Sequence, residues 1–184
     1  MNGKNIRWLR GCLAFGLTLA VLSLGQFLWH NYAVAQPLDK VLQDVDGVEK
    51  ITWQDSRRQN EPVNIFVTLD HPANLQKTYM EISERAARVL GRQPFRVVIR
   101  DHRTPELEQL FYDVHYYFQE AITNGNFSLM ADKVREKARS QGAEANIYVD
   151  GQYIYVQLTR QNDSFYTLIP RMPERGEGKY NGLR

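Results

Sequence analysis

A run of 19 residues without a charged side chain, Gly11–Trp29, is the feature that most restricts what this chain can fold into. It reads GCLAFGLTLAVLSLGQFLW, and Gln26 is its only strongly polar residue. As a helix it would be about 28 Å long, close to the thickness of the hydrocarbon core of a bilayer. The run is apolar on every face, whereas a helix that packs on a soluble core is apolar along one stripe. It therefore predicts a transmembrane helix over residues 11–29, through which the protein would contact the membrane.

The charges that flank the run predict its orientation. Lys4, Arg7 and Arg10 precede it, whereas the matching stretch after it holds only Asp39 and Lys40. Lys and Arg collect on the cytoplasmic side of membrane helices. We therefore expect a single-pass protein of the cell membrane with its N-terminus in the cytoplasm and its C-terminal domain outside.

The same segment has a second interpretation, as a signal peptide that is removed. Ala33-Val34-Ala35 is a small-x-small tripeptide of the kind that signal peptidases cut, so cleavage after Ala35 would release a secreted protein. The apolar region of a cleaved signal is usually about 7–15 residues long, which is shorter than the run found here. This length favours a retained anchor, and cleavage stays the alternative.

Four parts of the chain follow from this interpretation. We expect a cytoplasmic N-terminus over residues 1–10 and the anchor over 11–29, with the signal-peptide alternative ending at 35. One extracytoplasmic domain would occupy residues 36–171. Residues 172–184 are polar and Gly-rich, which predicts a disordered tail.

Charge and cysteine content exclude several classes of function. The chain has 23 basic and 21 acidic residues, and three of the basic ones lie before the apolar run. The rest of the chain is thus nearly neutral and lacks the overall basic charge typical of nucleic-acid binding, so we expect no nucleic-acid partner. Cys12 is the only cysteine, which excludes an intrachain disulfide and a metal site built from several thiolates.

Hydrophobic periodicity predicts an α+β domain with the order αββαβ followed by ααβββ. Asn74 and Thr104-Pro105 are typical of helix starts, and Gly91 is typical of a helix end. Alternating apolar residues, clearest from Val63 to Leu69, indicate strands. We expect a largely antiparallel sheet with helices packed on one face. The helices are predicted over 37–45, 75–90, 105–123 and 128–141, and the strands over 48–54, 63–69 and 95–100, with three more at the C-terminal end.

The element order of residues 37–103, a helix, two strands, a helix and a strand, resembles that of the BON-type domains of bacterial envelopes. The resemblance rests on this order alone. It implies an extracytoplasmic location in the bacterial cell envelope and no particular site residue.

The C-terminal strands give the best local signal in the chain. Asp150-Gly151 between two alternating runs predicts a two-residue hairpin turn of the primed type, which would pair Tyr148 with Tyr153 and Ile147 with Ile154. A second two-residue turn is expected at Asn162-Asp163, and it would pair Tyr166 with Thr159.

The alternation of these strands separates two faces. One face is aliphatic and should meet the helices, and the other carries tyrosines. Tyrosine has a flat apolar body and a polar tip, which suits binding of an envelope protein or a glycan. Tyrosines also stabilise sheets without any ligand. We keep the tyrosine face as the candidate partner-binding surface, formed by Tyr148, Tyr153, Tyr155 and Tyr166.

Candidate catalytic residues are few. Asp101-His102-Arg103 follows a predicted strand end, a place where active-site residues often gather. The sequence shows no nucleophile motif, phosphate loop or HExxH pattern beside it, so a solvated turn is the simpler interpretation. We therefore expect no catalytic residues, no metal and no cofactor. The leading hypothesis is a membrane-anchored, non-catalytic interaction or assembly module of the bacterial cell envelope. The alternative is a secreted or anchored envelope enzyme with its site near Asp101-His102-Arg103.

Overall fold

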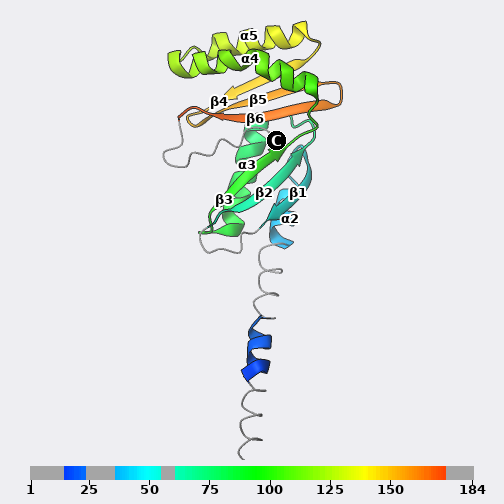
Figure 1. Ribbon diagram of the computed structural model, residues 1–184, viewed down its shortest axis with the longest axis vertical. Coiled ribbons are helices and arrows are strands. Elements are labelled where there is room, and N and C mark those ends of the chain that lie inside the picture. Colours follow the sequence, from blue (N-terminus) through cyan, green and yellow to red (C-terminus); the bar gives the residue numbers. More distant parts are fainter. Residues whose placement is uncertain (1–14, 24–35, 55–60, 173–184) are drawn as a thin grey trace, which may run out of the picture.

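The computed structural model describes residues 15–23, 36–54 and 61–172 of the chain. Residues 15–23 are helical and their side chains are exposed (Figure 1). Beyond them, ten elements follow one another in the predicted order. They are α2 (Gln36–Leu42), β1 (Val48–Gln54), β2 (Val63–Leu69), α3 (Leu75–Leu90), β3 (Phe95–Arg100), α4 (Pro105–Asn124), α5 (Phe127–Ser140), β4 (Glu144–Val149), β5 (Tyr153–Arg160) and β6 (Asp163–Pro170).

The predicted membrane segment is only partly within the described residues. Of the range 11–29, the structure describes 15–23, and no helix in the described part of the chain is long and apolar enough to cross a bilayer. The predicted cytoplasmic stretch 1–10, the cleavage site at Ala35 and all but the first residue of the predicted tail 172–184 lie outside the described residues.

The strands form two sheets of three strands each, and this corrects the single, largely antiparallel sheet that the sequence predicted. In the first sheet, ordered β1-β2-β3, β1 and β2 are antiparallel and β2 and β3 are parallel. The parallel pair arises because α3 carries the chain from the end of β2 back to the start of β3. The second sheet, ordered β4-β5-β6, is an antiparallel meander.

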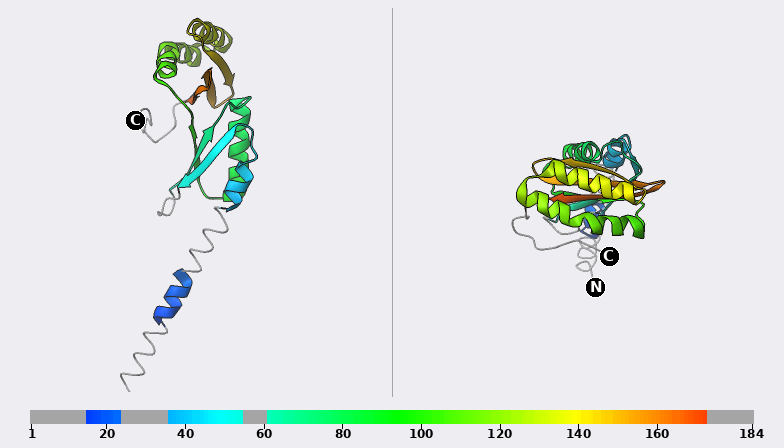
Figure 2. Two further views of the ribbon diagram at one scale, coloured as in Figure 1. Left: turned by 90° about the vertical axis from the view of Figure 1, so that its right-hand side faces the viewer. Right: turned by 90° about the horizontal axis from the view of Figure 1, so that it is seen from above.

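Within the described residues, helices pack on one face of the first sheet only. β2 alternates buried and half-buried residues along its whole length, and its buried side faces α3 (Figure 2). Helix α3 begins at its predicted cap, where the Asn74 side chain accepts a hydrogen bond from the Lys77 N–H at 3.0 Å, and it ends at Gly91. The apolar stripe of α3 and the short helix α2 complete the core of this half; it includes Leu38, Leu42, Ile65, Val67, Leu75, Ile82 and Ala86.

The second sheet has both faces covered. Helices α4 and α5 pack on one face, where they meet Ile154, Val156 and Leu158 of β5. The other face lies against α3, so that the molecule is layered from α4 and α5 down to α2 (Figure 1). The aliphatic face that the sequence predicted to meet the helices is confirmed, and its members Ile147, Val149, Ile154, Val156 and Ile169 all lie in or against the core under α4 and α5.

Both hairpin registers differ from the predicted ones by two residues. Tyr148 lies opposite Tyr155 instead of Tyr153, and Ile147 lies opposite Val156 instead of Ile154. The two-residue loop is Gly151-Gln152, because the Asp150 carboxylate accepts the backbone N–H groups of Gln152 at 2.7 Å and Tyr153 at 2.8 Å and draws the turn one residue along the chain. Gly151 does not have the positive φ that a primed turn with Gly in this place requires.

The second hairpin is displaced by the same amount in the opposite direction, with its turn one residue nearer the N-terminus than predicted. Tyr166 lies opposite Gln157 instead of Thr159, and Arg160 lies opposite Asp163, so Gln161-Asn162 forms the loop. Gln161 has φ 55°, a left-handed conformation that is uncommon outside glycine.

The burial of Tyr155 predicts a large cost of its removal. Only 2% of this side chain is exposed, so Tyr155→Ser should lower the free energy of unfolding by about 3–5 kcal/mol, as loss of a buried aromatic ring does. The control is Tyr112→Ser on α4, where 67% of the side chain is exposed and the change should stay within about 0.5 kcal/mol. Urea unfolding followed by circular dichroism measures both, and equal stability of the two variants would contradict this packing.

Candidate functional site

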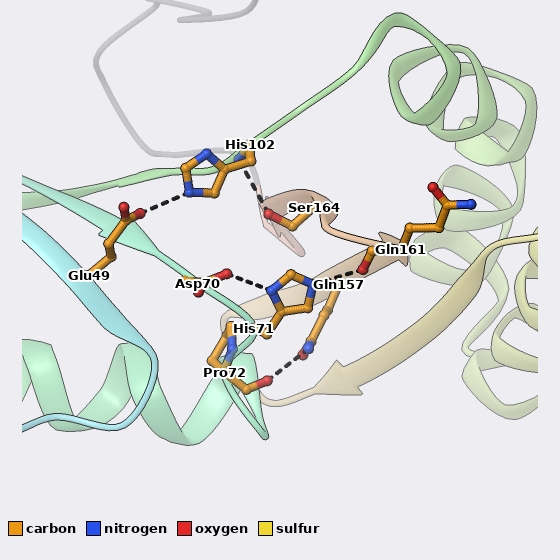
Figure 3. A network of polar contacts seen from close by, with 8 residues as sticks. All are labelled: Glu49, Asp70, His71, Pro72, His102, Gln157, Gln161 and Ser164. Atoms are coloured by element: carbon orange, nitrogen blue, oxygen red, sulfur yellow. Dashed lines mark hydrogen bonds and ion pairs between the residues drawn. The ribbon is translucent and has the colours of Figure 1, made fainter.

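The molecule has two halves: the first sheet with α2 and α3, and the second sheet with α4 and α5. The predicted candidate site, Asp101-His102-Arg103, connects them. The segment leaves β3 in the first sheet and runs beside the start of β6 in the second (Figure 3). The Ser164 N–H donates to the His102 carbonyl at 3.0 Å, and the His102 N–H donates to the Ser164 hydroxyl at 3.3 Å. The backbone of His102 therefore joins the edge of one sheet to the edge of the other.

The Asp101 carboxylate is buried at this connection, with 2% of its side chain exposed. The Arg103 guanidinium donates to it twice, at 2.8 and 3.2 Å, and the Tyr166 N–H donates at 2.6 Å. A buried carboxylate needs such donors because its desolvation would otherwise be costly. Both oxygens of Asp101 are thus occupied by partners that hold the halves together.

The side chains of Arg103 and His102 have different surroundings. The Arg103 guanidinium lies 4.7 Å from the centre of the Phe165 ring. Burial alone would lower the pKa of Arg103, but hydrogen bonds and charge from Asp101, with help from Glu108, raise it above the ordinary value. The His102 ring contacts Glu49 at 2.8 Å, and nearly half of each side chain is exposed. The ring of His102 is therefore a peripheral contact, whereas its backbone is central.

A second set of contacts joins the loop after β2 to the second sheet. Gln157 is buried; its amide donates to the Pro72 carbonyl at 2.8 Å and its side-chain oxygen accepts the Leu75 N–H at 3.4 Å. His71 contacts the Asp70 carboxylate at 2.5 Å through Nδ1 and the Gln161 carbonyl at 3.3 Å through Nε2 (Figure 3). We call these contacts, together with those of Asp101-His102-Arg103, the junction.

The His71 ring faces two acceptors. A carboxylate and a carbonyl can only accept hydrogen bonds, so both are satisfied at once only by the doubly protonated ring. The hydrogen bond with Asp70 raises the pKa of His71, burial opposes this, and the Gln161 carbonyl adds to the rise. His71 and Gln161 are also the two non-glycine residues with positive φ, 43° and 55°, in the described part of the chain.

The predicted tyrosine face exists, and it lies against α3. The sequence placed Tyr148, Tyr153, Tyr155 and Tyr166 on one face, and all four belong to or border the core that α3 completes. Tyr79 of α3 packs against Tyr153 and Tyr155, with ring centres 6.2 and 5.9 Å apart. Tyr155 and Tyr166 are each 2% exposed, so the expectation of an open surface is corrected for these two. Tyr148 and Tyr153 are half-buried beside them.

Hydrogen bonding inside this face is structural as well. The Tyr155 hydroxyl donates to the Asp150 carboxylate at 2.7 Å. Burial, and then this hydrogen bond, raises the pKa of Tyr155. Burial alone would raise the pKa of Asp150, but the hydrogen bonds from Tyr153, Tyr155 and Gln152 hold it below the ordinary value. The pair locks the hairpin turn against the sheet.

In the described part of the chain, no helix covers the face of the first sheet that points away from α3 (Figure 2). The sequence analysis did not identify this face as a candidate surface. The registers of β1, β2 and β3 place side chains on this face in three rows, each with one residue from each strand. The cationic residues belong to the two outer rows. We call this surface the cationic face. Its rows are Lys50-Thr68-Arg100, Thr52-Phe66-Val98 and Gln54-Asn64-Arg96.

The cationic face has three positive charges and no acidic residue among its nine positions. Lys50, Arg96 and Arg100 are exposed, and within the described residues none of them forms an ion pair. The Arg100 guanidinium lies 4.3 Å from the centre of the half-buried Phe66 ring. The signal that could have found this surface is the alternation of side chains in three strands whose bounds the sequence predicted correctly.

Metal and cavity chemistry have little support in the described residues. No group of three or more His, Cys, Asp or Glu side chains there is arranged to hold a metal ion. Two hollows in the same residues lie between α2 and α3 and between α5 and β4, and His102 does not line either of them. The junction is therefore arranged as a connection between two cores.

The buried position of Asp101 predicts a measurable loss of stability when its charge is removed. Asp101→Asn replaces an acceptor of three N–H groups by a side chain with one oxygen, and should lower the free energy of unfolding by about 2–3 kcal/mol. The matched control is Asp132→Asn, which also faces an arginine but is 75% exposed and should change stability by less than about 0.5 kcal/mol. Urea unfolding compares them, and an unaffected Asp101→Asn variant would refute the structural role.

His71 predicts a pH dependence of the junction. Because its folded pKa is raised above the unfolded value near 6.5, its stabilisation is complete below that value and is lost as the pH rises through the folded pKa. Wild type should therefore exceed His71→Asn in stability more at about pH 5.5 than at about pH 8.5. The difference should be under about 1 kcal/mol, since the ring is partly exposed.

The variant His71→Asn is suited to this test because Asn tolerates the positive φ at this position. NMR titration of the ring gives the second measurement. The pKa of His71 should lie above the ordinary value in wild type and fall toward it in Asp70→Asn, which removes the main cause of the rise. An identical titration in the two proteins would show that Asp70 does not act on His71.

Comparison of the chain with protein-family models, with curated proteins and with solved structures finds no match. The candidate site is accordingly interpreted from the residues themselves. The side chains of Asp101 and Arg103 are engaged in the contacts of the junction, whereas the cationic face is open.

Proposed function

We propose that this protein is a membrane-anchored, extracytoplasmic interaction module of the bacterial cell envelope that has no catalytic activity. Residues 11–29 would hold it in the membrane as a single pass, with the N-terminus in the cytoplasm. The domain outside would bind an envelope protein or a glycan. Lys4, Arg7 and Arg10 before the apolar run support this orientation.

The observation that carries the non-catalytic part of the proposal is the use of Asp101. An enzyme centred on Asp101-His102-Arg103 would need these side chains available to a substrate. Instead, the Asp101 carboxylate is 2% exposed and accepts hydrogen bonds from Arg103 and from the Tyr166 backbone. The alternative of an envelope enzyme at this segment therefore has less support.

The way the two halves share a core supports an interaction module as well. Tyr155 and Tyr166 of the second sheet are part of the core that α2, α3 and the first sheet form. A shared core and a hydrogen-bonded junction hold the halves together, and a preorganised surface loses less conformational freedom on binding. The cationic face is an open surface on this assembly of elements.

Membrane anchoring and orientation are tested together. A reporter that works only outside the cytoplasm, fused after Arg171, should be active, and one that works only in the cytoplasm should be silent. The native protein should stay in the membrane fraction after a high-salt wash and keep its mass of 21.4 kDa. A native N-terminus at Gln36 would show instead that the segment is a cleaved signal peptide.

The non-catalytic part is tested with His102→Ala in the native host. The His102 backbone makes the junction contacts and its ring makes only an exposed contact with Glu49, so the variant should accumulate normally and restore any defect of a deletion strain. An enzyme that uses this histidine would lose its activity. A variant that accumulates to wild-type amounts but does not restore the defect would favour the enzyme.

A further inference from the structure

We propose that the cationic face docks on the anionic lipid headgroups of the membrane in which the protein is anchored. The inference rests on the proposed function, because it takes residues 11–29 to be the anchor. It adds a second membrane contact to that function, made by the folded domain, and names its chemistry as negatively charged phospholipid.

The composition of the cationic face fits a headgroup region. Its central row, Thr52-Phe66-Val98, is largely apolar, and the rows on either side contribute the three cations. Arginine and lysine stems can lie along an apolar surface while their charged ends reach phosphates. An apolar centre with cations around it is the pattern of protein surfaces that lie at a membrane interface.

Charge complementarity requires that these cations are not already neutralised. Lys50, Arg96 and Arg100 have no ion pair within the described residues, and Arg100 contacts the Phe66 ring instead of a carboxylate. Glu49, at the bulge in β1 next to Lys50, is directed to His102 at the junction (Figure 3). The face therefore offers net positive charge to whatever covers it.

The short linker between the predicted anchor and the domain favours the bilayer over other anionic partners. Helix α2 begins at Gln36, and Trp29 ends the apolar run, so the intervening residues span at most about 25 Å. The first sheet belongs to the half of the domain that α2 joins (Figure 1). The tether thus holds the cationic face near the headgroups at a high effective concentration, which makes even a weak electrostatic contact sufficient.

The test uses the full chain in lipid vesicles. Cys12→Ser removes the native thiol, and Thr52→Cys on the cationic face carries a fluorescent acceptor, while a donor labels lipid headgroups. In a matched protein, Ser140→Cys at the exposed last residue of α5 carries the same acceptor and reports on the opposite end of the domain. Vesicles of zwitterionic phosphatidylcholine are compared with vesicles that also contain anionic phosphatidylglycerol.

We expect energy transfer at Thr52 to increase when anionic lipid is present and to fall again in high salt, with no such change at Ser140. The variant Lys50→Gln/Arg96→Gln/Arg100→Gln should lose this increase, because each cation contributes about a fivefold factor to docking on an anionic surface. The control Lys77→Gln/Arg88→Gln/Arg139→Gln also removes three exposed cations but lies on the helices, and it should keep the increase.

Several results would overturn the proposal. They are an increase that survives in the face variant, an equal loss in the control, or no response of Thr52 to anionic lipid. A Thr52 probe that responds only to soluble polyphosphate added to neutral vesicles would assign the face to a soluble polyanion. The variants with one substitution, Arg96→Gln and Arg100→Gln, should each lose part of the increase, which keeps the test valid if the triple variant does not fold.

Failure of the proposed function gives a different result. A protein that does not remain with the vesicles after an alkaline wash has no membrane anchor, and the proposed function fails with it. A protein that remains with them, but whose Thr52 probe ignores lipid charge, is anchored without docking of this face.

Discussion

The buried carboxylate of Asp101 is the interaction on which the arrangement of this molecule depends. It lies directly after the end of β3, where the chain leaves the first sheet. The carboxylate accepts hydrogen bonds from Arg103 and from the backbone of β6. The first half is incomplete without the second, since the core under α3 includes Tyr155 and Tyr166 from the second sheet. Burial of these rings favours the contact between the halves, and the Asp101 hydrogen bonds fix its geometry.

Local structure was largely predictable because it is set by short-range patterns. The bounds of β1, β2, α3 and β3 were predicted correctly from alternation, the Asn74 cap and the Gly91 stop. The hairpin registers were wrong by two residues, yet every tyrosine lies on the face predicted for it. A shift of two residues preserves the alternation, whereas a shift of one would have turned each side chain to the opposite face. The division into two sheets was not predictable, because strand pairing across the chain leaves no local trace.

The candidate site shows the same division. Asp101-His102-Arg103 was singled out because reactive side chains follow a strand end, but only the fold reveals that Asp101 is enclosed by Arg103 and β6. The near-neutral charge of the domain indicated no polyanion partner. A net charge summed over the sequence does not show where positive and negative side chains lie on the surface. Strand alternation brings Lys50, Arg96 and Arg100 to one face with no acid among its nine positions. The alternation of side chains along the strands therefore predicts a local charge that the overall composition does not show.

The junction also decides what a docked domain would present to its surroundings. Because the second sheet contributes Tyr155 and Tyr166 to the core under α3, the orientation of the first sheet sets the orientation of α4 and α5 at the far end of the molecule (Figure 1). Tyr112 and Tyr116, one turn apart on α4, are 67% and 72% exposed there. A hinge between the halves would leave these side chains free to point in any direction. The contact between the His71 ring and the Gln161 carbonyl opposes such a hinge, because it connects two loops across the junction, each with one residue of positive φ.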